Sequence, residues 1–168
     1  MRYRFPESGD RELLAEYVRE HCDGGETEIS AGMGLGDLEF GEWLDKVRAS
    51  ALTGDGERGR SLLFLCFCED RLAGLLCVRY ELPQRLSAVY GDIGYGVRPS
   101  ERKRGFATEM LRYALSVCRE KGMERAVVGC YKDNPASAAV IKKNGGVLTA
   151  ENDNYTKGVI SQYYTITL

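Results

Sequence analysis

The stretch GYGVRPSERKRGFATEML, residues 94–111, joins an apolar run to a helical pattern through a basic turn. Four basic residues, at 98 and 102–104, fall within seven positions, although the chain as a whole carries a net charge of −2. A helix N-terminus offers backbone N–H groups without helical partners and a partial positive charge. Positive side chains gathered at such a turn favour a binding site for a pyrophosphate.

Gly105 lets the backbone of this turn come close to a ligand. The turn lacks the GxxxxGK[ST] pattern of a P-loop and the GxGxxG pattern of a dinucleotide-binding loop. The alternative interpretation is a solvated basic turn without a ligand. The GMGLG stretch at 32–36 has no strand before it and is interpreted as a flexible loop, with a substrate lid as one role.

Composition narrows the class of protein. A chain of 168 residues with 43% hydrophobic residues predicts a single domain, 1–168, around one core. The slightly acidic balance argues against a general nucleic-acid binder. Without an apolar run of about 18 residues or a signal-peptide core in MRYRFPESGDRELL, we expect a cytoplasmic protein with no membrane partner.

The cysteines and the histidine give no sign of a metal site. The six cysteines form no CxxC pair, and most lie in apolar runs, so we expect reduced core thiols and no metal. Cys66 and Cys68 are interpreted as packing residues of one strand. His21 lies at a polar helix end and is expected to be solvated.

The hydrophobic pattern predicts alternating helices and strands. We expect helices over 10–22, 39–50, 105–121 and 133–146, strands over 61–68, 72–82, 86–99, 124–131, 147–151 and 158–168, and Gly-rich loops over 23–37 and 53–60. Asp133 or Asn134 would cap the last helix, with Pro135 in its first turn. This order predicts a mixed α/β fold with one curved, mostly antiparallel sheet flanked by helices.

Two motifs together resemble the GCN5-related N-acetyltransferases, the GNAT family. RKRGFA, residues 102–107, matches the signature Arg/Gln-x-x-Gly-x-Gly/Ala between a strand and an amphipathic helix. DNPASAAVIKKNGG, residues 133–146, resembles the second signature, in which an Asn opens a helix that ends in a Gly-containing turn. The resemblance covers about residues 61–150 and is greatest to the bacterial predicted-acetyltransferase branch.

The resemblance implies splayed central strands and acetyl-CoA, or another acyl-CoA, as the donor, bound by a core of about residues 88–146. Backbone groups at 95–97 would hold the pantetheine arm, and N–H groups from 102 to 108 the pyrophosphate. The implied cofactor-binding residues are Tyr95, Gly96, Val97, Arg102, Lys103, Arg104, Gly105, Phe106, Ala107, Thr108, Asn134, Ser137 and Lys143. Asn134 has the alternative role of a plain helix cap.

The family transfers the acyl group directly to an amine, so a base must deprotonate the acceptor. Asp92 is the first candidate, because strand alternation would place it on one face with Tyr90, Gly94 and Gly96. The alternative for Asp92 is an exposed strand charge. Glu28 and Glu39, near the first loop, are weaker candidates.

The usual family tyrosine, seven residues after the helix-opening Asn, falls at Ile141 in this chain. We therefore assign the general acid to Tyr131, with Tyr163 and Tyr164 as substitutes and core packing as the alternative for each. The expected acceptor is a primary amine of a small molecule or peptide.

Three further alternatives stay open. The missing tyrosine favours a CoA-binding sensor or interaction module without turnover. A protein that binds a different phosphate-containing ligand at this turn is another alternative, but it would not explain the second motif. The final run VISQYYTITL, residues 159–168, is a candidate sheet edge for a homodimer.

Overall fold

The computed structural model describes residues 1–54, 56 and 59–168, so part of the predicted 53–60 loop lies outside it. The helices are α1 (Arg11–Asp23), α2 (Phe40–Leu52), α3 (Gln84–Tyr90), α4 (Phe106–Glu120) and α5 (Pro135–Lys143), with 3-10 turns η1 (Ser8–Asp10) and η3 (Pro99–Glu101). The strands are β1 (Arg2–Arg4), β2 (Ser61–Cys68), β3 (Arg71–Arg79), β4 (Ile93–Val97), β5 (Arg125–Tyr131), β6 (Val147–Thr156) and β7 (Val159–Thr167).

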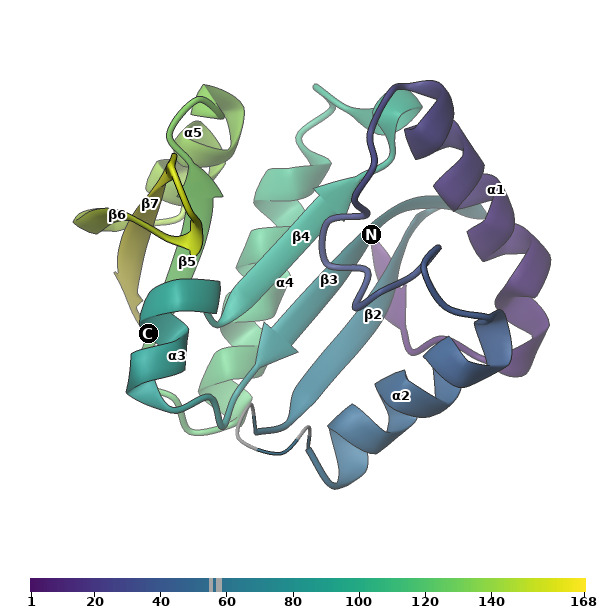
Figure 1. Ribbon diagram of the computed structural model, residues 1–168, viewed down its shortest axis with the longest axis horizontal. Helices are drawn as coiled ribbons and strands as arrows, with labels where there is room; N and C mark the ends of the chain where they lie inside the picture. Colours follow the sequence, from purple (N-terminus) through teal and green to yellow (C-terminus); the bar gives the residue numbers. More distant parts are fainter. Residues whose placement is uncertain (55, 57–58) are drawn as a thin grey trace.

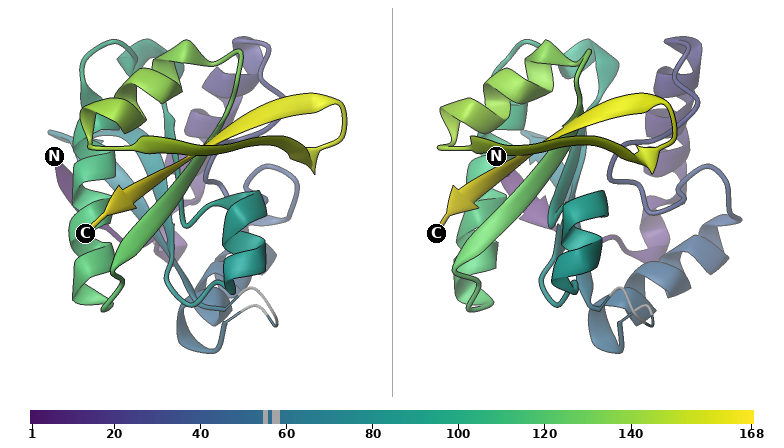
Figure 2. Two further views of the ribbon diagram at one scale, coloured as in Figure 1. Left: turned by 90° about the vertical axis from the view of Figure 1, so that its left-hand side faces the viewer. Right: turned by 60° about the vertical axis from the view of Figure 1, so that its left-hand side comes forward.

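These described strands form one sheet in the order β1-β2-β3-β4-β5-β7-β6, in which β4 and β5 are parallel and the other neighbours antiparallel (Figure 1). The predicted mixed α/β fold is therefore confirmed. Helices α1 and α2 cover one face of the sheet and α4 the other (Figure 2). Because β2 is buried on both faces, its sequence SLLFLCFC is apolar at almost every position.

Strands β4 and β5 pair in register at one position, where Ile93 lies opposite Val128. Just before this pair, the Asp92 N–H donates to the Val127 carbonyl at 2.6 Å, and the Asp92 carboxylate accepts from the Val127 N–H at 2.7 Å. Beyond it, β4 follows β3 and β5 follows β7, and the two strands separate (Figure 1). Asp92 therefore pins the point at which the sheet splits.

The predicted strand over 86–99 is wrong in its first half. Residues 86–90 belong to α3, which follows Pro83 and ends at Gly91 with φ of +69°. A proline before the first turn and a glycine in the left-handed region after the last one are helix signals. They outweigh the apolar residues of LSAVY, and the strand begins only at Ile93.

Other boundaries differ in smaller ways. Strand β1 was not predicted, because three residues at an edge carry no periodic signal. The predicted dimer edge is wrong, since β7 pairs with β5 on one side and β6 on the other. All six cysteines carry free thiols, but Cys22 is exposed rather than buried in the core. No helix in the described part of the chain combines the length and apolarity that crossing a membrane requires.

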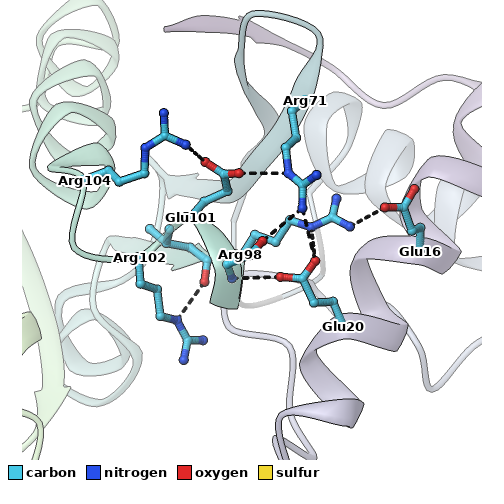
Figure 3. A network of polar contacts seen from close by, with 9 residues as sticks. Glu16, Glu20, Arg71, Arg98, Glu101, Arg102 and Arg104 are labelled. Atoms are coloured by element: carbon cyan, nitrogen blue, oxygen red, sulfur yellow. Dashed lines mark hydrogen bonds and ion pairs between the residues drawn. The ribbon is translucent and has the colours of Figure 1, made fainter.

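A buried arginine fastens the end of β4 to α1. The Arg98 side chain is 3% exposed, with Nε 2.5 Å from Glu20 Oε2 and Nη2 2.5 Å from Glu16 Oε1 (Figure 3). The Ser100 N–H donates to the other Glu20 oxygen at 2.8 Å. Since α1 leads directly into the loop over residues 24–39, this ion pair also fixes where that loop starts.

A second buried charge, Glu101, extends the same network. Its carboxylate accepts from Arg71 Nε at 2.8 Å and pairs with Arg104, while Arg71 also reaches Glu20 at 3.5 Å (Figure 3). Glu101 is 6% exposed, so both of its cationic partners offset the cost of burying its charge. Acidic side chains therefore form ion pairs with the arginines in and around the basic turn.

Replacing Arg98 with Met should lower the free energy of unfolding by about 3 kcal/mol, since it leaves Glu20 without its buried partner. Urea denaturation gives this value. The matched control is Arg48→Met, because Arg48 and its partner Asp45 are both exposed. That control should change the free energy by about 0.5 kcal/mol or less. Equal effects of the two substitutions would contradict the role of Arg98.

Glu20 should also make stability depend on pH. Burial alone would raise its pKa, but hydrogen bonds from Ser100 and Arg98 lower the pKa to about 2. A carboxylate with a lowered pKa stabilises the fold above its unfolded pKa of about 4.3, and this contribution is lost as the pH falls toward 2. Between pH 6 and pH 3, wild type should therefore lose more stability than Glu20→Gln. Parallel profiles would contradict the assignment.

Candidate functional site

A cleft of about 470 Å³ lies where β4 and β5 separate. Its walls come from Gly94 and Tyr95 of β4 and from Gly129, Cys130 and Tyr131 of β5. The loop over 28–37, α3, the start of α5 and the β6–β7 hairpin also line it, as do Lys46 of α2 and Arg79 of β3. The predicted flexible loop around GMGLG is therefore one wall of the cleft.

The backbone of β4 presents alternate residues to this opening. The Arg98 N–H donates to the Ala73 carbonyl of β3, so by alternation the backbone groups of Gly96 also face β3. Those of Tyr95 and Val97 face the side of β5, and the Val97 carbonyl already accepts from Arg102 Nε at 3.1 Å. Of the three predicted backbone partners, Tyr95 and Val97 point the right way and Gly96 does not.

Gly96 has a different role. A Cβ on this residue would lie 2.7 Å from the Ser30 carbonyl oxygen, which is too close for any other amino acid. The glycine therefore allows the loop after α1 to cross directly over β4.

The turn before α4 forms a row of free backbone donors. Lys103 and Gly105 both have positive φ, +62° and +85°, and Gly105 is the N-cap of α4. In the described chain, the N–H groups of Lys103 through Ala107 meet no protein acceptor, whereas Arg102 donates to Pro99 and Thr108 to Gly105. The predicted cradle over 102–108 is thus one residue shorter at each end. Consecutive free N–H groups at a helix N-terminus suit a phosphate group.

Most of the positive charge at this turn is already paired. Arg102 Nη1 lies 2.6 Å from Glu26 Oε1, and Arg104 pairs with Glu101 and lies over the Phe106 ring. Lys103 is exposed, and no ion-pair partner for it occurs among the residues described. Anion binding at this turn therefore depends on backbone N–H groups and Lys103 more than on the arginines.

The prediction of a solvated His21 is wrong. Its side chain is 1% exposed, and Nδ1 lies 2.9 Å from Glu26 Oε2. Hydrogen bonding from Arg102 first, and from His21 second, lowers the pKa of Glu26. The chain His21–Glu26–Arg102 ties the end of α1 to the turn before α4, a contact that no local pattern could reveal.

Residues at the start of α5 face β4 across the cleft. Asn134 Oδ1 accepts from the Ser137 N–H at 3.0 Å, which confirms the predicted cap, and both residues line the cleft. Ser137 Oγ lies 2.8 Å from the Tyr95 hydroxyl, and burial raises the pKa of Tyr95 to about 12. Lys143, by contrast, is exposed in the last turn of α5 and lies outside the cleft lining.

Asp92 lies outside the residues that line the cleft. Its carboxylate accepts from Val127 and from the Ser87 side chain, and it borders a second cavity beside α3 rather than the cleft. Burial raises its pKa despite these hydrogen bonds. The alternation argument fails because Tyr90 is helical and Asp92 binds β5 through its side chain. Its role is to hold the two strands together.

The two weaker candidates for the base lie in different places. Glu28 lines the cleft. Glu39 caps α2 through the Gly41 N–H and pairs with Arg11, outside the cleft lining.

Among the predicted acids, Tyr131 lines the cleft, and its hydroxyl shares a hydrogen bond of 3.2 Å with Thr156 Oγ1. Tyr163 also lines the cleft, but its hydroxyl donates to the Val89 carbonyl at 2.8 Å. Tyr164 and Ile141 are fully buried in the core with α4. The position of the usual family tyrosine is therefore a packing position in this chain.

The comparisons with known proteins identify the family. Residues 35–147 match a family described as the acetyltransferase (GNAT) domain. The ribosomal-protein-serine acetyltransferase of Escherichia coli (strain K12) is 30% identical over 93 residues, which is 55% of this chain and 50% of that protein. The matched region thus spans about half the length of this curated relative.

Solved structures share the fold over nearly the whole chain. RimL, the ribosomal L7/L12 alpha-N-protein acetyltransferase in complex with coenzyme A, superposes with a TM-score of 0.72 at 21% identity, over 99% of this chain and 93% of that one. The yncA protein from Salmonella typhimurium with acetyl-CoA gives 0.69 at 16% identity, over 99% and 93%. Because the family match covers more than half of the sequence, the chain belongs to the GNAT acetyltransferase family.

Proposed function

We propose that the protein is an acyl-CoA-dependent N-acetyltransferase that transfers the acetyl group of acetyl-CoA to a primary amine. The observation that carries this proposal is the row of free N–H groups at Lys103–Ala107, on the turn that follows the diverging strand β4. The family supports it, and structural neighbours bind coenzyme A or acetyl-CoA.

The residues present fit an acyl-CoA. The N–H groups of Lys103 through Ala107 would hold the pyrophosphate, with the Lys103 ammonium beside it. The backbone groups of Tyr95 and Val97 on the open side of β4 would hold the amides of the pantetheine arm. Asn134 and Ser137 would border the arm from α5. When bound, acetyl-CoA supplies the acetyl group as a reactive thioester.

The protein's contribution to the transfer is position and proton handling. The acceptor must lose a proton to attack as a free amine, and Glu28 is a carboxylate in the cleft that can receive it. The Tyr131 hydroxyl can donate a proton to the departing thiolate. A backbone N–H on the open edge of β4 can stabilise the negative charge that develops on the carbonyl oxygen.

The acceptor class, the cellular location and an alternative function are also part of the proposal. The relative acetylates a ribosomal protein according to its name, so an amine of a peptide is one acceptor class and a small molecule the other. The cytoplasmic location stays a prediction. A CoA-binding module without turnover is the second candidate, favoured by the isoleucine at position 141.

The first experiment is thermal unfolding with acetyl-CoA, CoA, ATP and NAD at equal concentrations. A ligand at 100 times its dissociation constant adds about 2.7 kcal/mol of stability, and we expect this shift from acetyl-CoA and CoA alone. Gly105→Glu should abolish it, because a carboxylate would face the pyrophosphate.

The matched control is Gly122→Glu, at the other end of α4. Both glycines are exposed, have positive φ and have open space around a Cβ, so both substitutions strain the backbone alike. Gly122→Glu should keep the shift. Retention of the shift by both variants would place the donor elsewhere, and a shift without transfer to any amine would favour the second candidate.

Tyr131→Phe should lower kcat by about tenfold, because a thiolate leaves readily and needs little acid assistance. Tyr163→Phe is the control and should change kcat less, since that phenol lines the same cleft but its hydroxyl is bound to Val89.

Asp92→Asn should leave kcat within about twofold, because its carboxylate lies outside the cleft. Release of free CoA thiol measures all three rates, and a large loss in Asp92→Asn with unchanged stability would restore Asp92 as the base.

A further inference from the structure

Arg79, the last residue of β3, brings a positive charge into the cleft. Its Nη1 donates to the Gly91 carbonyl at 3.3 Å, and it lies 3.8 Å from where a Cβ of Gly94 would be. The guanidinium therefore rests on the sheet surface beside the β4 wall. In the described part of the chain, no carboxylate lies within ion-pair distance of it. The remaining N–H donors of its fork are available to a ligand.

A negative charge and three aromatic rings surround the same space. The Tyr155 hydroxyl, on the β6–β7 hairpin, donates to Glu28 Oε1 at 3.4 Å. The Tyr155 ring lies 6.1 Å from that of Tyr90 and 6.0 Å from that of Tyr131. We call Glu28, Arg79, Tyr90, Tyr131 and Tyr155 the acceptor pocket. All five line the cleft.

Both charges of the acceptor pocket act on one hydroxyl. Burial raises the pKa of Tyr155, Glu28 raises it further and Arg79 opposes the rise. Both charges thus influence Tyr155, and among the ion pairs of the described residues none joins Glu28 to Arg79. A pocket that holds opposite charges apart is complementary to a ligand that carries both.

The dimensions of the cleft favour a small ligand. The Glu28–Tyr155 contact joins the loop over 28–37 to the β6–β7 hairpin, which Figure 2 shows projecting beyond the sheet. The volume of about 470 Å³ must also hold part of the donor. The Glu28–Tyr155 contact and the limited volume therefore favour a small amine over a polypeptide.

We infer that the acceptor is a small zwitterionic amine of the amino acid type, whose carboxylate is bound by Arg79 and whose ammonium is bound by Glu28. The inference rests on the proposed function, because only a transferase requires an acceptor. A guanidinium binds a carboxylate through paired N–H donors, and the tyrosine faces attract a cation. A peptide N-terminus carries no adjacent anion and would leave Arg79 without a partner.

The test compares L-amino acids with their amides, their decarboxylated amines and a tripeptide amide, using release of CoA thiol to obtain kcat and KM. Wild type should prefer an acid over its amide by about tenfold or more, the effect of a charge-assisted hydrogen bond. Arg79→Met should remove this preference by raising KM for the acid alone. Arg79→Lys, which keeps the charge but not the fork, should retain part of it.

Glu28→Gln is the matched variant for the other charge. It should lower kcat/KM for the acid and its amide alike, because both share the ammonium. The thermal shift with acetyl-CoA should be unchanged in every variant, which separates this inference from the donor site. A missing shift in wild type would instead overturn the proposed function, and this inference with it.

Three outcomes would overturn the inference alone. The first is wild-type turnover of amides or of the tripeptide amide at least as fast as of acids, a comparison that needs no variant. The second is an acid preference that survives in Arg79→Met. The third is transfer to other amines with none to any amine that carries an acid.

Discussion

Strands β4 and β5 run parallel, pair at Ile93 and Val128, and then separate. The constraint that produces this geometry is the double hydrogen bond between Asp92 and Val127, one from each backbone N–H. It holds the strands together at one end, and each strand then stays with its antiparallel neighbour. The open end exposes backbone groups that a closed sheet would consume. The cleft lies along this opening, and the turn before α4 follows the open strand β4 in the chain.

The charges around the cleft divide into structural and available ones. Arg98 is buried between two glutamates of α1, and Arg104 forms an ion pair with Glu101. These pairs fix α1 and the turn, and α1 in turn sets the start of the loop that crosses Gly96. Among the residues described, the groups without an ion-pair partner include the backbone N–H groups at 103–107, Lys103 and, in the cleft, Lys46 and Arg79. A cluster of basic residues in a sequence can therefore be paired within the protein and not be the charge that contacts a ligand.

The turn before α4 and the acceptor pocket use different physical means. At the turn, left-handed backbone at Lys103 and Gly105 aligns N–H groups that a single anion can satisfy together. At the acceptor pocket, side chains from five elements or loops converge, and their opposite charges stay apart. The first arrangement is local in the chain. The second exists only because the loop after α1, the end of β3, α3 and the strands beyond β5 meet in space.

The sequence by itself determined the features that depend on near neighbours. Apolar runs defined β2 and β3, Asn134 and Pro135 started α5, and RKRGFA with DNPASAAVIKKNGG indicated the family. Tertiary structure decided the roles of individual side chains. Asp92 turned toward Val127, His21 was buried against Glu26, and Ile141 entered the core. The physical reason is range: backbone propensity acts over a few residues, whereas burial and ion pairing join residues that the chain order leaves far apart.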